Sequence, residues 1–268
     1  MTEDARLPAL ASTNIKEDRH FVTALARGLE VLSCFRSGNQ ALGNQELALR
    51  CKLPKSTVSR LTSTLVKLGY LKHDDDSGKY SLGMATLSLG VGMLDRLDIR
   101  QVARPFMQEL ADATQTMVSL GVRDRLSMLY IENCRSRSAL TLSLDIGSRL
   151  PIATSSMGRA YLAMASEQER NDIIARLLEQ GKLPENEIID NINQATADFL
   201  SLGCTCSFGD WQENVNGIAV GFQLSPAHPI MVLTCGAPSF SVSSEFLLNE
   251  ARPKLLEAVS KIVSPVRR

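Results

Sequence analysis

The chain has 268 residues, of which 44% are apolar, 22% charged and 5% aromatic. These values are typical of folded globular proteins and exclude a disordered, collagen-like or coiled-coil chain. The length predicts two domains, each able to bury its own core. No apolar run of about 18 residues and no signal-peptide pattern occur, so we expect a cytoplasmic protein without a membrane partner. The six cysteines follow no regular spacing, so we expect reduced thiols and no disulfides.

The formal net charge is zero, but charge is distributed unevenly along the chain. The segment from Arg19 to Lys72 holds nine positive and two negative residues, whereas residues 1–18 and 73–268 are both net acidic. A local basic excess indicates a phosphate-binding module joined to a part that is not attracted to DNA. The alternative is a solvated surface whose charges have no such role.

Residues 1–18 mix charge, proline and small polar residues without periodicity and are predicted to form a disordered arm. A first helix that ends at 37–38 is predicted from an apolar stripe at helical spacing: Val22, Leu25, Leu29, Leu32 and Phe35. A short second helix has Asn44 as its N-cap and turns Leu47 and Ala48 inward. After a three-residue turn, a third helix starts at Pro54, ends at Gly69 and has as its apolar seam Val58, Leu61, Leu65 and Leu68.

Residues 70–73 and 79–82 are predicted to pair as a β-hairpin around the turn at 74–78. Three helices followed by a hairpin make a winged helix-turn-helix, which we place at residues 19–83. In this architecture the second helix of the pair enters the major groove of DNA with its polar face. The candidate DNA-binding residues are Lys55, Ser56, Thr57, Ser59, Arg60, Ser63 and Lys67 on that helix, and Lys72 in the wing.

These candidates have different expected roles. Arg60 can pair bidentately with a guanine, and the hydroxyls of Ser56 and Ser59 can bind bases or phosphates. Lys55 and Lys67 suit backbone phosphates, and the three aspartates at 74–76 would be repelled by them, so we expect the wing to be a weak reader of DNA. The alternative is a polar helix face in a domain that binds no nucleic acid.

Residues 84–100 are apolar at helical spacing but contain Gly90 and Gly92, which favours a linker helix that packs against a partner chain. A homodimer or a homotetramer is expected as well, because two DNA half-sites are bound by a two-fold pair of modules. The expected macromolecular partners are therefore double-stranded operator DNA and further copies of this chain.

Residues 101–268 alternate helical segments with short apolar runs. A helix is predicted at 101–114 with the inward stripe Val102, Phe106, Leu110 and Ala113. Strands are predicted at 116–121, 127–134, 139–144, 203–208, 217–224 and 230–235, and helices at 156–165, 167–180, 187–200 and 243–263. A mostly antiparallel sheet flanked by helices is typical of an α+β sensor-like domain.

The common motifs of hydrolases, nucleotide-binding proteins and zinc sites are absent from the sequence, so we expect no catalytic residue, metal or cofactor. The three histidines are far apart, and Cys204 and Cys206 lack a second pair of ligands. Residues 150–160 instead form a hydroxyl-rich loop that leads into a helix, where Gly158 would let a ligand approach the backbone. Such a helix start favours a carboxylate; the alternative is ordinary N-capping by Ser155 or Ser156.

Five ordered segments resemble the IclR family of bacterial transcriptional regulators, from Phe21 to Val263. They are ALARGLEVLSCF, LPKSTVSRLTSTLVKLGY, GKYSLGMATLSLG, LPIATSSMGRAYLA and GDWQENVNGIAVGF. The resemblance implies a winged helix-turn-helix joined by a linker helix to a GAF-like α+β effector-binding domain at residues 101–268. It also implies dimers or tetramers that control catabolic operons in response to small acids.

The resemblance places the effector pocket on eight residues: Ser156, Met157, Gly158, Asp210, Val215, Gly217, Leu233 and Cys235. Leu233 and Cys235 stand at positions that can carry hydroxyls, so the sequence predicts a more apolar pocket and an aromatic or otherwise hydrophobic carboxylate. We expect the effector to shift the population of sensor arrangements, and the linker helix to transmit that shift to the recognition helices. The alternatives are an enzyme acting on a small acid with an accessory winged-helix module, and a protein-protein adaptor.

Overall fold

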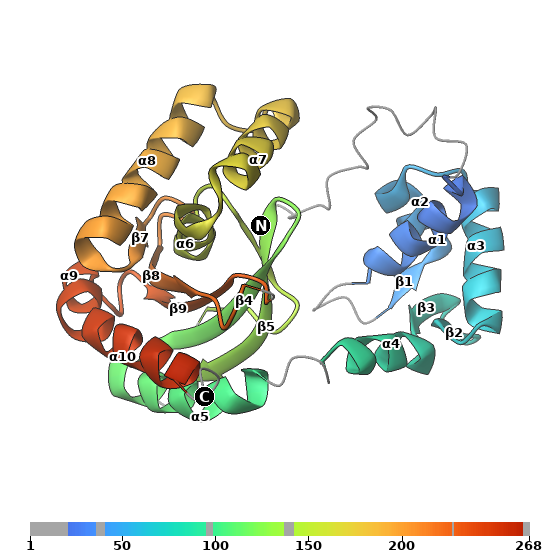
Figure 1. Ribbon diagram of the computed structural model, residues 1–268. Coiled ribbons are helices and arrows are strands. Elements are labelled where there is room, and N and C mark those ends of the chain that lie inside the picture. Colours follow the sequence, from blue (N-terminus) through green and yellow to red (C-terminus); the bar gives the residue numbers. More distant parts are fainter. Residues whose placement is uncertain (1–20, 36–40, 95–98, 137–141, 227, 265–268) are drawn as a thin grey trace. The chain divides into compact units, whose positions relative to one another are not determined.

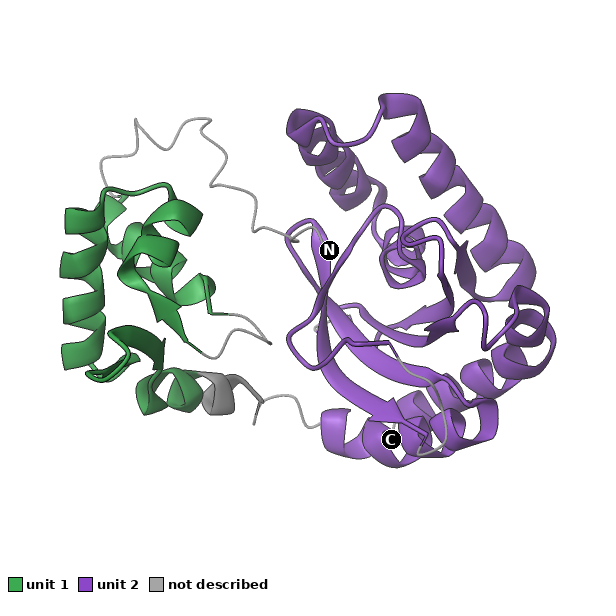
Figure 2. Ribbon diagram, turned by 180° about the vertical axis from the view of Figure 1, so that it is seen from behind, with its two compact units in different colours: residues 1–98 green, residues 99–268 purple. Residues whose placement is uncertain are grey.

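The computed structural model describes residues 21–35, 41–94, 99–136, 142–226 and 228–264. The chain divides into two compact units, residues 1–98 (unit 1) and residues 99–268 (unit 2), coloured green and purple in Figure 2. The predicted arm at 1–18 lies outside the described residues.

The described residues of unit 1 form four helices and a small sheet (Figure 1). The helices are α1 (Thr23–Ser33), α2 (Asn44–Cys51) and α3 (Lys55–Lys67), and α4 (Met84–Leu94) follows the sheet. The strands are β1 (Leu42–Gly43), β2 (Leu71–Asp74) and β3 (Lys79–Leu82), in the order β1-β3-β2. The antiparallel pair of β2 and β3 is the predicted hairpin, which confirms a winged helix-turn-helix.

The core of unit 1 shows where the expected helix faces were wrong. Val31 and Phe35 are buried in α1 and just after it, whereas Val22, Leu25 and Leu29 are each more than half exposed. The predicted stripe on α1 is therefore mainly a surface of the unit, because a repeating apolar spacing shows that a face is apolar without showing what covers it.

In α3, Val58 and Leu65 are buried as predicted, but Leu68 is 60% exposed because it follows the last turn. The buried residue between them is Thr62, whose hydroxyl donates to the carbonyl oxygens of Val58 (3.0 Å) and Ser59 (3.1 Å). A buried hydroxyl that is satisfied by its own helix fits an apolar core at little cost.

The cap of α2, the helix before α3, lies one residue earlier than predicted. The N-cap of α2 is Gly43 instead of Asn44, and its N–H donates to the Glu46 carboxylate at 2.9 Å. Pro54 precedes the first turn of α3, and Gly69, with φ +76°, ends the helix in a left-handed conformation that suits glycine.

Unit 2 is built around a six-stranded antiparallel sheet in the order β6-β5-β4-β9-β8-β7. The strands are β4 (Met117–Asp124), β5 (Ser127–Arg135), β6 (Arg149–Pro151), β7 (Thr205–Phe208), β8 (Val215–Phe222) and β9 (Met231–Pro238). One face is covered by α6 (Ser156–Met164), with α7 (Glu167–Gln180) and α8 (Glu185–Leu202) outside it. The other face is covered by α5 (Ile99–Thr114) and α10 (Arg252–Val263) (Figure 1).

Several predicted elements of unit 2 need correction. The inward stripe of α5 is rotated by about one residue, and Ala113 is exposed; the buried residues are Ile99, Ala103, Met107, Leu110, Ala111 and Thr114. Residues 142–144 are not a strand, 137–141 lie outside the described residues, and the strand β6 was missed. The last helix is divided into α9 (Ser244–Phe246), a π-helical turn at Leu247–Ala251 and α10.

The segment predicted as one linker helix at 84–100 belongs to two elements. The helix α4 ends at Leu94 in unit 1, and α5 begins at Ile99 in unit 2. Residues 95–98 between them lie outside the described residues.

Candidate functional sites

The outer face of α3 is polar and accessible. Val58, Thr62 and Leu65 fix the inner face of the helix in the core of unit 1. All the predicted DNA-binding side chains except Thr57, which is half-buried, are exposed: Lys55, Ser56, Ser59, Arg60, Ser63 and Lys67, together with Lys72 on β2. The helix has no acidic residue, so the whole outer face presents only cations and hydroxyls.

The wing is acidic at its tip. Asp74, Asp75 and Asp76 are exposed, and Asp75 lies 2.8 Å from the Nδ1 atom of His73. The hydrogen bond from Ser77 lowers the pKa of Asp74, so this carboxylate stays ionised at neutral pH. An anionic tip is repelled by phosphates, which leaves α3 as the surface of unit 1 best suited to a polyanion.

Unit 2 contains a small hollow of about 20 Å³, room for about one water molecule, between the start of α6 and the sheet. Its wall combines hydroxyl, amide, aromatic and aliphatic side chains with two glycines: Tyr130, Leu142, Leu150, Ser155, Ser156, Ser207, Trp211, Val215, Asn216, Gly217, Thr234 and Gly236. The hydroxyl oxygens of Ser156 and Thr234 are 3.4 Å apart, and Thr234 donates to the carbonyl of Ile218 at 2.8 Å. The hollow thus offers hydrogen-bonding groups beside apolar surface.

The start of α6 is capped from within the chain. The Ser155 hydroxyl accepts a hydrogen bond from the Gly158 N–H (3.1 Å) and donates to the Pro151 carbonyl (2.6 Å). Ser155 is therefore the N-cap, and Ser156, the first residue of the helix, lies in the wall of the hollow. The N-capping alternative applies to Ser155.

Three of the eight predicted effector residues line the hollow: Ser156, Val215 and Gly217. A Cβ atom on Gly217 would lie 2.9 Å from the Ser156 oxygen, so this glycine keeps the space open. A Cβ atom on Gly158 would lie 2.1 Å from the Ile152 carbonyl oxygen, so its close approach is to the chain's own backbone. Met157 is fully buried in the core against Gly121 and lies outside the wall.

Leu233 and Cys235 lie on the opposite face of the sheet from the hollow. Side chains alternate along a strand, and β9 turns Thr234 and Gly236 to the hollow instead. Cys235 is fully buried near Thr116, and burial raises the pKa of its thiol to about 12. The expectation of a more apolar pocket rested on these two residues, which lie outside the wall, and Thr234 supplies a hydroxyl there.

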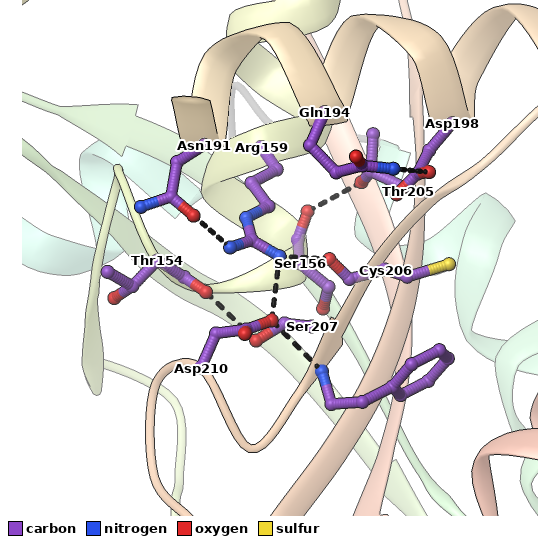
Figure 3. A network of polar contacts seen from close by, with 11 residues as sticks. Thr154, Ser156, Arg159, Asn191, Gln194, Asp198, Thr205, Cys206, Ser207 and Asp210 are labelled. Carbon is purple, nitrogen blue, oxygen red and sulfur yellow. Dashed lines mark hydrogen bonds and ion pairs between the residues drawn. The ribbon is translucent and has the colours of Figure 1, made fainter. Parts of the chain in front are cut away.

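Asp210 takes part in a polar network next to the hollow (Figure 3). Arg159, which is 5% exposed, donates from Nη1 to the Asp210 carboxylate (2.8 Å) and to the Cys206 carbonyl (2.7 Å). Its Nη2 atom donates to Asn191. This network holds the β7–β8 loop against α6 and α8, and the next residue in that loop, Trp211, contributes to the wall of the hollow.

Most residues of this wall were not predicted from the sequence, including Tyr130, Asn216 and Thr234. The role of Arg159 was not predicted either. An arginine inside a mostly apolar helix was the one visible signal, since a buried guanidinium requires several acceptors around it.

The described residues contain neither a metal site nor a membrane-spanning helix. Within the described ranges, no group of three or more His, Cys, Asp or Glu residues is placed to hold a metal ion. No helix in the described part of the chain has the length and apolar character needed to cross a bilayer.

Two protein-family models match the chain. The IclR helix-turn-helix domain matches residues 24–75, and the bacterial transcriptional regulator IclR C-terminal domain matches residues 91–264. The chain belongs to the IclR family of bacterial transcriptional regulators. It is thus a DNA-binding regulator with an effector-binding C-terminal domain. It is not an enzyme, since its relatives are named as transcriptional regulators and repressors.

Individual relatives match most of the length of this IclR-family chain. The HTH-type transcriptional regulator TsaQ1/TsaQ2 of Comamonas testosteroni is 36% identical over 248 residues, which cover 92% of this chain and 89% of that protein. An IclR-family transcriptional regulator from Brucella abortus superposes with a TM-score of 0.80 at 45% identity, over 93% of this chain and 94% of that one. An IclR homologue from Microbacterium hydrocarbonoxydans complexed with 4-hydroxybenzoate superposes with a TM-score of 0.74 at 25% identity, over 91% and 99%.

Proposed function

We propose that this IclR-family regulator controls a catabolic operon, and that a small carboxylic acid bound in the hollow of unit 2 alters its affinity for operator DNA. The observation that carries the proposal is the hydroxyl-bearing wall at the start of α6, opposite aromatic side chains, in a chain whose helix-turn-helix exposes a cationic face. The relative complexed with 4-hydroxybenzoate supports an aromatic acid as the effector.

Operator contact is assigned to the outer face of α3 and to the wing. Arg60 reads a base in the major groove, and the other residues hold phosphates or hydrogen-bond to base edges: Lys55, Ser56, Thr57, Ser59, Ser63, Lys67 and Lys72. The support is their shared exposure on a helix without acidic residues.

Arg60→Ala tests this assignment. Loss of a bidentate contact to a guanine should weaken operator binding by about 1–3 kcal/mol, roughly 5- to 150-fold. The measurement is a quantitative mobility shift with the intergenic DNA beside the regulator's own gene. Arg176→Ala, which removes an exposed arginine from α7 in unit 2, is the matched control and should leave the affinity unchanged. Equal affinities for all three proteins would show that Arg60 does not read the operator.

The effector is assigned as an aromatic carboxylate. The hydroxyls of Ser156 and Thr234 suit the carboxylate at the positive end of α6, and a hollow widened by the ligand would place the ring against Tyr130 and Trp211. The apolar character that favours an aromatic acid comes from these rings and from Leu142, not from the strand residues first considered.

Trp211 is the only tryptophan in the chain, so its fluorescence reports on the hollow directly. We expect 4-hydroxybenzoate or benzoate to change the fluorescence saturably, and acetate to change it less. Gly217→Val should abolish the change, because its side chain would occupy the space beside Ser156, whereas Cys235→Ala on the opposite face should not. An unchanged signal with every acid of such a panel would contradict an aromatic acid effector.

A route from the hollow toward the linker lies in β5. Tyr130 lines the hollow, and an irregularity in the β4–β5 pairing separates it from Glu132, which is buried beside α5. Glu132 accepts from Arg104 (2.7 Å) and pairs with Arg100 (3.2 Å), both near the start of α5. A ligand that moves Tyr130 would therefore alter the ion pairs of Glu132 at the start of α5. Such a ligand would shift the population of sensor arrangements.

The regulator is assigned as a homodimer, or a homotetramer built from dimers. The helix α4 exposes Met84, Leu87 and Leu89 by more than half, and unit 1 alone does not cover them. A second copy would bury these side chains and supply the second recognition helix that an operator with two half-sites requires.

A further inference from the structure

Two cysteine thiols of unit 1 are in contact. Cys34 directly follows α1, Cys51 is the last residue of α2, and their sulfur atoms are 3.3 Å apart. We propose that Cys34 and Cys51 form an oxidation site, which closes to an intramolecular disulfide when the protein meets a hydroperoxide. Neither sulfur takes part in a disulfide in the structure.

The pair is held ready for this bond by the surrounding helices. A disulfide has a sulfur–sulfur distance of about 2.05 Å, so the two atoms need to approach by little more than an ångström. Both helices pack against α3 and against each other in one core. The Arg50 side chain also donates to the Cys34 carbonyl at 3.2 Å, which ties the end of α1 to α2.

The two thiols have different parts in the reaction. Cys51 is 5% exposed, whereas Cys34 is partly exposed and meets an oxidant first. The hydrogen bond to Cys34 and burial hold the pKa of the Cys51 thiol well above its usual range, so Cys51 keeps its proton at first. Cys34 is therefore the attacking sulfur and Cys51 the resolving one.

In the first step the Cys34 thiolate attacks one oxygen of hydrogen peroxide. The O–O bond breaks, Cys34 becomes a sulfenic acid, and the hydroxide that leaves takes the proton of Cys51 to form water. In the second step the Cys51 thiolate attacks the Cys34 sulfur, the S–O bond breaks and the S–S bond forms. The second hydroxide takes a proton from solvent, so two thiols are oxidised while one peroxide is reduced to two waters.

The disulfide would join the ends of α1 and α2 immediately before the turn that leads to α3. It would close a loop that contains residues 35–50 and so restrict the unfolded chain more than the folded one. Oxidised unit 1 should therefore resist unfolding, while the small movement of the sulfurs leaves the outer face of α3 in place.

The test treats the full-length protein with hydrogen peroxide, blocks the remaining thiols by alkylation, and digests with trypsin without reduction. Mass spectrometry should find peptide 28–36 joined to dipeptide 51–52, at a mass lower by two hydrogen atoms, as the dominant cross-link. Dithiothreitol should abolish it. The urea midpoint followed by far-ultraviolet circular dichroism should be higher for the oxidised protein and return on reduction.

Cys34→Ser and Cys51→Ser should each abolish the cross-link, and in Cys51→Ser dimedone should trap the Cys34 sulfenic acid. Cys204→Ser, which removes a buried thiol of unit 2, is the matched control and should leave the cross-link intact. The proposal is overturned if the wild-type protein, still folded, returns both residues as alkylated thiols. Cys34 oxidised only to sulfinic acid, a bond only between separate copies, or a cross-link that appears only after unfolding would overturn it too.

Discussion

Two glycines near the hollow are required for different physical reasons. Gly158 faces the carbonyl oxygen of Ile152, a backbone atom that cannot move aside, whereas Gly217 faces the Ser156 hydroxyl, which can rotate. The spacing of glycine in the sequence does not separate these cases. The atom that an added Cβ would contact decides the role of the glycine. Contact with backbone makes the glycine necessary for stability, and contact with a side chain in the wall makes it necessary for the space of the hollow.

Gly158→Ala should lower the free energy of unfolding of unit 2 by about 3 kcal/mol, and Gly217→Ala by about 1 kcal/mol, because overpacking against backbone costs more. Urea unfolding followed by Trp211 fluorescence measures both. Equal losses would show that Gly158 is not fixed by Ile152, and would leave its predicted place beside the ligand as the better explanation.

On α3 most residue assignments from sequence agree with the structure in exposure, with Leu68 and Thr57 as exceptions, because one strong helical repeat fixes both faces at once. Thr62 was not predicted to be buried, since its hydroxyl is satisfied by the helix's own carbonyls and burial then costs little. Composition alone does not reveal such internal satisfaction.

Among the elements, strands were harder to assign than helices. The strand β9 was found, but the residues that face the hollow were taken one position off, and in a strand one position reverses the face. Every residue of β9 is buried, so no polar alternation marks its faces in the sequence. The sequence therefore predicted several of the elements that line the hollow, with the facing residues of β9 reversed.

The N-caps of α6 and α7 differ in burial and in their hydrogen bonds. Ser155 is buried and makes two hydrogen bonds, whereas Ser166, the N-cap of α7, is exposed and accepts one from Glu169 at 3.2 Å. Ser155→Ala should cost about 1–2 kcal/mol and Ser166→Ala about 0.5–1 kcal/mol of unfolding free energy. Urea unfolding of the two variants measures the difference. A larger loss for Ser166→Ala would mean that the buried cap does not anchor α6.

We propose that the exposed apolar face of α1, like that of α4, is covered by a second copy of the chain. Leu25 and Leu29 are exposed by more than half, although the sequence predicted them to face the core of unit 1. Leu25→Gln together with Leu29→Gln should lower the sedimentation coefficient toward that of a monomer, because the apolar area available to a second copy falls. Leu200→Gln, which changes an even more exposed leucine in unit 2, should leave the sedimentation coefficient unchanged. Unchanged sedimentation in the double variant would exclude α1 from the interface.

Across the whole chain, positive charge is concentrated in unit 1 and unit 2 is net acidic. The net charge of zero conceals a basic segment between Arg19 and Lys72 and an acidic remainder, and this pattern was visible in the sequence before any fold. The order of elements was also predictable, because each unit has its own strong apolar periodicity. The assembly of copies was less accessible, since it depends on faces that one chain leaves uncovered.

The segregation predicts a steep salt dependence for operator binding. Each phosphate neutralised by a lysine or arginine should contribute about −0.9 to the slope of log affinity against log salt concentration. Lys67→Ala should make the slope shallower by about one such increment for each copy bound, because it deletes a single phosphate contact. Mobility shifts over a series of salt concentrations measure both slopes. Identical slopes for wild type and variant would remove Lys67 from the phosphate contacts.

We expect the outer face of α3 to lie against an operator duplex. DNase I footprinting of the intergenic DNA detects this contact, with the wild-type protein compared with a triple variant carrying Lys55→Ala, Ser59→Ala and Arg60→Ala. These side chains are exposed, so the variant should fold normally by circular dichroism. The wild type should protect a site that the folded variant leaves unprotected; equal protection at the same protein concentration would show that this face does not contact the operator.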